Sequence, residues 1–505
     1  MNANFKQLGL AAAVAAASAG YAGVVNSAAE IAGNQLGDMA VVPYYTVQGD
    51  FVTGVHVINT SDYTQVVKLR LRRATDSMDA LDFNLIMSPK DEWTGFLKND
   101  TDGGQITFNS ADTTCTVPEL INNQAPMPPI YNLAAETGYI EVIGMGAADP
   151  NQPIYSDSLH VAGVPVSCDR VRENFLADGV AGTSTGVINS TSSVQTNAKD
   201  ALVTNTYMDA SDSLKVSFFV RDGTAGVEFG SNATHFSGFM ANPSITNQER
   251  GIFSGDLQGF DYPDLNGGAP LSVLTGVPNA ATRGKFNEIR ASIGGSNLSN
   301  DWSNASSDAG FTVGTDWVVT APGQYTMLDL TDFIPNAIGV EEGFCTPKTA
   351  TEAAVACDFR DIPLTASFVV YDREENEIVV DPGELVFSPT IPGLVPDVTL
   401  DKEVNVVQWA DESVLDAPTT IVVPVPEGAV NGWASLTVAP TSAHAQSVCD
   451  FAPDPNSPGD VITACTPAIG GVPLVGFVAW QRSFSANPDA NYGRIIDHSY
   501  TVSAP

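Results

Sequence analysis

Strand-length alternation between apolar and polar residues is the feature that most constrains the fold of this chain. The segments 67–72 (VKLRLR) and 214–221 (LKVSFFVR) place apolar residues at nearly every second position. Shorter strand-like runs follow at 52–58, 139–143, 315–320, 366–371, 404–409, 420–425, 433–438 and 475–480. Side chains alternate between the two faces of a strand, so this period predicts half-buried strands. Beyond the N-terminal segment, almost nothing keeps helical spacing over three turns, which favours an all-β fold over an α/β fold.

Turn formers separate these runs, and the 44 glycines and 32 prolines suit a chain with many turns. We therefore expect one or two immunoglobulin-like, Greek-key β-sandwiches with long loop insertions and few short helices. Residues 23–279 are predicted to form an N-terminal β-rich region, with a loop insertion at about 146–200 that is rich in Ser, Thr, Asn and Gly. Residues 280–505 are predicted to form a C-terminal sandwich. Greek-key connections can span long distances, so the two regions could also form one intertwined unit.

The first 22 residues have the pattern of a secretory signal peptide. Lys6 provides a positive charge, the run 8–19 is mostly Leu, Ala and Val, and small residues follow at 17–22. The apolar run is too short to span a bilayer. We expect a secreted protein, extracellular or at the cell surface, with the periplasm as the alternative, and we do not expect an integral membrane protein.

Six cysteines behind a signal peptide indicate disulfides, because export leads to an oxidising compartment. None of them lies in a CxxC pair, which is the usual spacing of zinc and thioredoxin sites. Six cysteines allow 15 connectivities, and closeness along the chain favours the pairs Cys115–Cys168, Cys345–Cys357 and Cys449–Cys465.

Charge excludes one class of partner. Lys and Arg number 22 against 58 Asp and Glu, for a formal net charge of −36. Nucleic-acid-binding proteins carry a basic footprint, so we expect no nucleic acid partner. The strand at 67–72 is an exception, because Lys68, Arg70 and Arg72 share one face. Such a stripe could contact another copy of the chain or a surface polysaccharide. Alternatively, it could pair internally with Asp or Glu on an adjacent strand.

Bound calcium is a second reading of the excess of acids. Asp100 and Asp102 precede Gly103, and Asp264 and Asn266 precede Gly267, so that each group resembles half of an EF-type loop. Both groups lack the first acidic ligand and the glutamate at position twelve. They are therefore weak calcium candidates, and no other cofactor is expected.

Motifs for catalysis are weak. The string 182–186 (GTSTG) fits GxSxG, but it lacks the apolar strand before it and the helix after it that a nucleophile elbow needs. The five histidines form no HExxH pattern. His498 follows Asp497 directly, but neighbouring residues in a strand point to opposite faces. We therefore expect no enzyme and no catalytic residue, and a secreted hydrolase is the third reading.

Several short strings lie in order along the chain. They are VPYYTVQ (42–48), VINTS (57–61), LDFNL (81–85) with Ser88-Pro89 and Glu92-Trp93, DWVV (316–319), YDREE (371–375) and NYG (491–493). Together they resemble a family of exported proteins of Gram-negative bacteria to which no activity is assigned. The resemblance implies an exported surface-type protein and nothing catalytic.

The leading expectation is a secreted, non-enzymatic structural protein of the cell surface or extracellular space that self-associates. The alternative is an exported module that binds a carbohydrate or another ligand. Exposed aromatic side chains would form its platform, and the sequence offers Tyr44, Tyr45, Trp302 and Trp433 as candidates.

Overall fold

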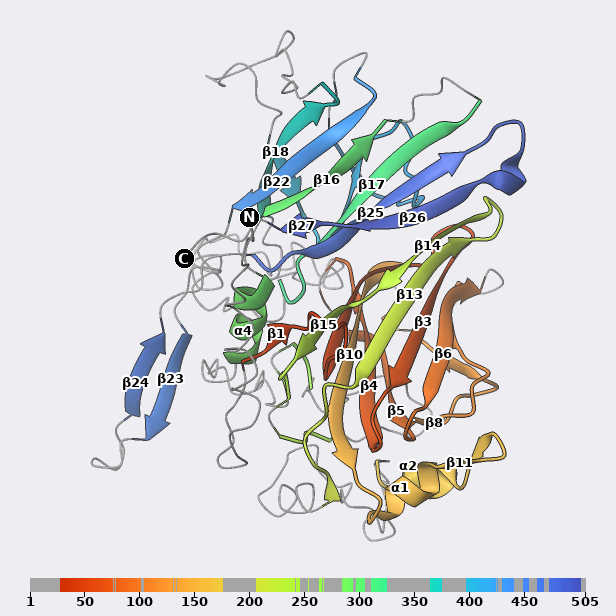
Figure 1. The fold of residues 1–505 in the computed structure, drawn as a ribbon, viewed down its shortest axis with the longest axis vertical. Helices are drawn as coiled ribbons and strands as arrows, with labels where there is room; N and C mark the ends of the chain where they lie inside the picture. The colour runs from red at the N-terminus through yellow and green to blue at the C-terminus, as the bar shows by residue number, and fades with distance from the viewer. Residues whose placement is uncertain are drawn as a thin grey trace, which may run out of the picture.

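The structure is a computed structural model dominated by antiparallel β-sheets (Figure 1). It describes residues 28–75, 77, 79–100, 104–129, 131–132, 134–175, 206–240, 242–245, 253, 263–265, 267, 284–293, 297–304, 310–324, 364–374, 397–423, 425, 429–439 and 472–500, and the backbone of 448–453 and 461–466. The predicted all-β sandwich architecture is confirmed. No helix among these residues is long and apolar enough to cross a membrane.

Two sheets form the first sandwich. The seven-stranded sheet has the order β1-β15-β2-β10-β4-β5-β8. Its strands are β1 (Glu30–Ile31), β2 (Met39–Thr46), β4 (Thr64–Arg73), β5 (Asp79–Met87), β8 (Cys115–Val117), β10 (Thr137–Ala148) and β15 (Thr234–Ser237). The six-stranded sheet has the order β14-β13-β3-β6-β7-β9. Its strands are β3 (Phe51–Asn59), β6 (Glu92–Asp100), β7 (Gln105–Asn109), β9 (Gln124–Pro126), β13 (Leu214–Asp222) and β14 (Val227–Asn232).

Two five-stranded sheets form the second sandwich. The outer sheet has the order β19-β18-β22-β16-β27. It contains β16 (Asn297–Ser303), β18 (Leu364–Asp372), β19 (Val398–Leu400), β22 (Asn431–Ala439) and β27 (Ser499–Tyr500). The inner sheet has the order β21-β20-β17-β25-β26. It contains β17 (Thr312–Thr320), β20 (Val404–Gln408), β21 (Ile421–Val422), β25 (Val475–Ser483) and β26 (Tyr492–Asp497).

The inner sheet is buried on both faces, which is why its strands read as nearly continuous apolar runs. Trp317 and Val319 of β17 pack toward the outer sheet, whereas Val318 between them packs into the core of the first sandwich. Phe477 of β25 extends that core, with its ring 6.4 Å from Tyr44 and 5.8 Å from Phe218. The two sandwiches therefore share an apolar interface, and Figure 1 shows the second lying along one end of the first.

The division between the sandwiches follows the sequence. Every strand of the first sandwich comes from residues 30–237, and every strand of the second comes from residues 297–500. The sheets do not exchange strands among the described residues. The proposed boundary near 279 lies outside those residues and stays a prediction.

The predicted loop insertion at 146–200 needs correction over its described part. Strand β10 continues to Ala148. Helices α1 (Pro153–Ser158) and α2 (Cys168–Glu173) follow, with the hairpin β11 (His160–Val161) and β12 (Val164–Pro165) between them. Apolar residues of this segment cover the end of the seven-stranded sheet, so it forms a small lid over core residues and is not an open loop. Residues 176–200 lie outside the described part.

The remaining elements are peripheral. Helix α4 (Gly284–Ile293) buries Phe286, Ile289 and Ile293 against the first sandwich, a spacing of three and four that places them on one helical face. The hairpin of β23 (Val448–Pro453) and β24 (Val461–Thr466) pairs only within itself. A 3-10 helix, η3 (Pro488–Ala490), precedes β26.

Candidate functional site

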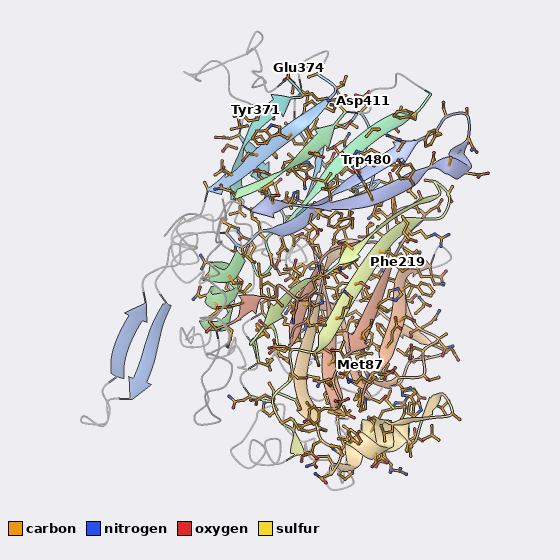
Figure 2. The ribbon with its side chains drawn as sticks, in the orientation of Figure 1. Met87, Phe219, Tyr371, Glu374, Asp411 and Trp480 are labelled. Carbon is orange, nitrogen blue, oxygen red and sulfur yellow. A yellow bond between two sulfur atoms is a disulfide. The ribbon has the colours of Figure 1, made fainter. Side chains whose placement is uncertain are left out.

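A cleft of 920 Å³ opens at one end of the second sandwich, between its two sheets. It lies where β16 and β18 end and β17 and β22 begin, next to the β25–β26 hairpin. Fourteen residues line it: Asp301, Trp302, Ser303, Phe311, Val313, Asp372, Arg373, Val430, Asn431, Gly432, Trp433, Trp480, Arg482 and Arg494. We call this site the aromatic–arginine cleft. Figure 2 labels Tyr371 on the outer sheet and Trp480 on the inner sheet.

The outer sheet carries a stacked aromatic pair at the end where the cleft lies. Tyr371 and Trp433 are opposite each other in the antiparallel pairing of β18 and β22. Their ring centroids are 4.3 Å apart and their planes differ by 12°. Their strand neighbours Val370 and Ala434 point into the core of the second sandwich, so the two rings lie on the opposite, solvent face of that sheet. Solvent reaches Trp433, because 42% of the surface of this residue is exposed. Stacked, partly exposed rings of this kind offer a flat apolar face with a polar edge.

Glycine is required beside this pair. Gly432 precedes Trp433 in β22, and a Cβ atom at this position would lie 1.9 Å from the carbonyl oxygen of Tyr371. The same carbonyl accepts a hydrogen bond of 3.1 Å from the indole of Trp302, a buried residue of the cleft lining. A side chain at Gly432 would therefore disturb the pairing of β18 with β22 next to the stacked rings.

The inner-sheet side carries two arginines against aromatic rings. Both strands of one hairpin have an aromatic residue two positions before an arginine, Trp480 before Arg482 and Tyr492 before Arg494. Antiparallel pairing sets Trp480 opposite Arg494 and Arg482 opposite Tyr492. The Arg494 guanidinium lies 4.5 Å from the Trp480 ring centroid and that of Arg482 lies 5.4 Å from it. Arg482 also lies 4.3 Å from the Phe311 ring centroid.

These arginines have no acidic partner in the described part of the chain. No ion pair there involves Arg373, Arg482 or Arg494, whereas most other arginines of the structure face a carboxylate. The Nε atom of Arg482 is buried and has no hydrogen-bond acceptor among those residues. Buried donors are nearly always paired in folded proteins, so this nitrogen is a hydrogen-bond donor at the cleft that the described residues leave without an acceptor.

The predicted contact stripe is not at the surface. Lys68 and Arg70 are 0% exposed and Arg72 is 1% exposed, so none of them can contact a partner. They lie on the face of the seven-stranded sheet that turns away from the six-stranded sheet. Here Lys68 Nζ lies 3.3 Å from Asp82 on β5, and Arg72 Nε lies 3.2 Å from Glu141 on β10.

The contact reading is therefore wrong and the internal-pairing reading is confirmed. Arg70 sits at the centre, with guanidinium nitrogens 3.9 Å from Asp82 and 3.8 Å from Glu141, and donates to the Pro263 carbonyl at 2.6 Å. We call these five side chains, Lys68, Arg70, Arg72, Asp82 and Glu141, the charge layer. Charges buried this deeply need opposite charges and hydrogen bonds to be tolerated.

The second sandwich closes one edge of the charge layer. Glu403 is fully buried, and its backbone amide donates to the Ala74 carbonyl at 2.8 Å, just after β4. Its carboxylate accepts from the Gly323 amide. Burial raises the pKa of Glu403 to about 8, although hydrogen bonds from Tyr139 and Gly323 oppose that rise. Burial also raises the pKa of Tyr139 well above its ordinary value.

Of the four predicted platform aromatics, only Trp433 is exposed. Tyr44 and Tyr45 are 0% exposed and Trp302 is 1% exposed. The two tyrosines lie on β2, which is covered on both faces, and Trp302 packs 5.6 Å from Trp409 inside the second sandwich. The platform prediction is therefore wrong for these three, and Trp433 is one of the residues that line the cleft.

The weak calcium candidates are only partly described. Asp100 ends β6, whereas Asp264 is fully buried next to Pro263, against the charge layer. Asp102 and Asn266 lie outside the described residues. Within the part of the chain that the structure describes, no three His, Cys, Asp or Glu side chains are grouped so as to hold a metal ion.

One predicted disulfide is confirmed. Cys115 on β8 is bonded to Cys168 at the start of α2, across 53 residues of sequence. This bond ties the helical lid to the edge of the seven-stranded sheet. Cys449 and Cys465 are directly opposite in the pairing of β23 and β24, and their bond stays a prediction. Cys345 and Cys357 lie outside the described residues.

Candidate catalytic side chains have structural roles where they are described. His498 is 4% exposed, with Nε2 3.0 Å from the Val318 carbonyl oxygen, and burial lowers its pKa to about 4. Ser88 Oγ and Asp91 Oδ2 lie 3.0 and 3.9 Å from the same nitrogen of His160, Nδ1. A catalytic triad needs serine and acid at opposite ring nitrogens, so this cluster does not fit one. The GxSxG string lies outside the described residues.

Sequence reasoning missed Tyr371, Trp480, Arg482, Tyr492 and Arg494. The usable signal was the repeated aromatic-x-arginine spacing, because residues two apart share a face of a strand. Only the pairing of β25 with β26 brings the two repeats together.

Comparisons with known proteins give no family. No family model matches the chain, and no curated relative matches it. A solved structure titled "NanB plus Optactamide" was found at 10% sequence identity, covering 94% of this chain and 75% of that chain, with a TM-score of 0.12. A score this low carries no argument about fold or function.

Proposed function

We propose that this protein is an exported, non-enzymatic β-sandwich protein that binds a carbohydrate in its aromatic–arginine cleft. The observation that carries the proposal is the aromatic lining of a 920 Å³ cleft, to which Phe311, Trp433 and Trp480 contribute. Sugar rings have apolar C–H faces and polar edges, and a flat aromatic surface with hydrogen-bonding groups around it complements both. Asp301, Ser303 and Asn431 supply such groups on the same wall.

Export is part of this proposal. Its support is the signal-like segment 1–22 together with the Cys115–Cys168 disulfide, a bond typical of oxidising compartments. N-terminal sequencing of the protein from the producing cell is expected to show cleavage after Ala19 or Ala22. An intact N-terminus on the folded, oxidised protein would contradict export by this route.

The structural, self-associating surface protein remains a prediction, with less support than the binding module. Its sequence argument was the basic stripe, which is buried in the charge layer. The cations that are accessible at the cleft, Arg373 and Arg494, suit a small ligand as well as a second copy.

The test compares Trp433→Ala with a matched control on a glycan array, using the full chain. Tyr63→Ala is the control, because Tyr63 is 39% exposed and lies in the first sandwich, away from the cleft. We expect the unchanged protein to bind a subset of glycans, Trp433→Ala to lose about 1–3 kcal/mol of binding free energy, and Tyr63→Ala to bind normally. Equal binding by both variants, or no glycan bound by the unchanged protein, would contradict the proposal.

A further inference from the structure

We infer that the ligand of the cleft is a saccharide carrying carboxylate groups, and that Arg482 and Arg494 bind a carboxylate of that saccharide. This inference rests on the proposed function and adds to it the chemical class of the ligand. It starts from the two arginines on the β25–β26 hairpin, which face the cleft without an acidic partner in the described part of the chain.

Arg482 is held in place but unsatisfied. Its guanidinium stacks on Phe311 at 4.3 Å and lies 5.8 Å from the ring centroid of Tyr492. Stacking fixes the plane of the group and leaves its donor edge for an acceptor in that plane. Because Nε is buried and finds no acceptor among the described residues, an incoming planar carboxylate can accept from Nε and a terminal nitrogen together.

Arg494 adds a second positive charge at the same place. Its guanidinium and that of Arg482 both lie against the ring of Trp480, at 4.5 and 5.4 Å from the centroid. Like charges held close together repel each other, and a bound anion relieves that repulsion. The chain has 58 acidic and 22 basic residues, and yet neither arginine forms an ion pair with an acid in the described part of the chain.

The outer-sheet wall of the cleft holds the sugar ring whose carboxylate the arginines bind. Trp433 lines the cleft from the outer sheet, and Arg482 and Arg494 line it from the inner sheet. Asp301 also lines the cleft and can accept hydrogen bonds from hydroxyl groups. The lining contains three arginines and two aspartates, so its net charge is positive by one. This charge suits a saccharide with one negative charge per sugar residue, as in a uronic acid. A flat aromatic wall favours a sugar ring over an acidic peptide segment.

The experiment measures binding of uronate oligomers to the full chain by calorimetry. The probes are tetramers of galacturonic, glucuronic and mannuronic acid, each paired with its carboxyl-reduced neutral counterpart, and one sulfated neutral tetramer of equal charge. We expect at least one uronate tetramer to bind about tenfold more tightly than its neutral counterpart. Arg482→Gln and Arg494→Gln are each expected to remove most of that tenfold preference, measured on each variant as the ratio of its affinities for the acidic and the neutral oligomer.

Arg221→Gln is the matched control, since Arg221 is an exposed strand arginine of the first sandwich. It is expected to keep the full preference, and thermal melting establishes that all three variants are folded. Equal affinity for acidic and neutral tetramers would overturn the inference and leave the proposed function standing. Binding of neither class, with no binding on the glycan array, would end both. Tighter binding of the sulfated tetramer would overturn the carboxylate assignment. Self-association that Arg482→Gln abolishes, with no saccharide bound, would assign the cleft to an acidic segment of a second copy.

Discussion

Arginines occur in two settings in this molecule, and the contrast between them separates structure from function. In the charge layer, Arg70 is sealed between the seven-stranded sheet and the segment around Pro263, with Asp82 and Glu141 within 4 Å. In the cleft, Arg482 and Arg494 lie at an open end of the second sandwich, backed by aromatic rings and without a described acidic partner. Arginines whose partners are built into the fold hold the fold together, whereas arginines backed by rings and left without acids are positioned for a ligand.

The sharpest way to break this comparison is Arg70→Met. This change leaves Asp82 and Glu141 short of a positive charge inside the protein, and breaking a buried ion network typically costs about 3–5 kcal/mol. We expect the unfolding free energy, measured with denaturant, to fall by that amount. Arg494→Met is the control and is expected to change it by less than about 0.5 kcal/mol. Similar losses for the two variants would mean that the two sets of arginines do not differ in role.

The next largest effect is a pH dependence of the unfolding free energy, caused by Glu403 at the edge of the charge layer. The ordinary pKa of Glu403 is 4.5, and burial raises it to about 8 in the folded protein. Between these values the unfolded chain is ionised while the folded chain keeps the proton. Stability from this group is therefore full below pH 4.5 and falls as the pH rises toward 8, by up to about 1.4 kcal/mol per pH unit.

Glu403→Gln removes this dependence, because glutamine cannot ionise. We expect denaturant unfolding at a series of pH values to show a flatter curve for Glu403→Gln than for the unchanged protein. Burial also raises the pKa values of Asp38 and Asp316 to about 7, so a slope from these acids remains. Glu412→Gln changes an exposed neighbour on the same segment and is expected to leave the curve as it was. Parallel curves for Glu403→Gln and the unchanged protein would contradict the raised pKa.

The same contrast explains which features of the structure the sequence predicts and which it does not. Alternation in VKLRLR predicted a strand with Lys68, Arg70 and Arg72 on one face, and the strand is there. Whether that face is exposed to solvent depends on the segments that pack over it. These segments contain Pro263 and Glu403, which are nearly 200 residues or more away from the strand in the sequence. Trp433 was identified as exposed, but Tyr44 was not identified as buried, because β2 is covered on its second face by strands from the other sandwich. Local patterns determine strands and faces, and long-range packing determines which faces reach water.

A smaller effect tests the cleft alone. Arg482 and Arg494 lie against one indole ring, and neither forms an ion pair with an acid in the described part of the chain. Replacing Arg482 with methionine keeps apolar contact with Phe311 and removes one charge. We therefore expect thermal stability of the unliganded protein to stay constant or to rise, by less than about 0.5 kcal/mol. A loss of more than about 1 kcal/mol would mean that Arg482 supports the fold, and the contrast with Arg70 would fail.

Salt concentration is expected to have the smallest effect. It distinguishes the accessible arginines of the cleft from the buried arginines of the charge layer without a change of ligand. Counterions screen accessible charges within about 10 Å at 0.1 M ionic strength and about 3 Å at 1 M, but they screen buried pairs much less. Raising sodium chloride from 0.05 to 0.5 M is therefore expected to weaken binding of a uronate tetramer a few-fold, while the stability difference between Arg70→Met and the unchanged protein stays constant. Binding of the neutral tetramer through the Trp433 platform is the internal control, because stacking carries no net charge. If salt weakened acidic and neutral binding equally, the arginines would not be supplying the attraction, and the cleft would be an aromatic site whose charges only face the solvent.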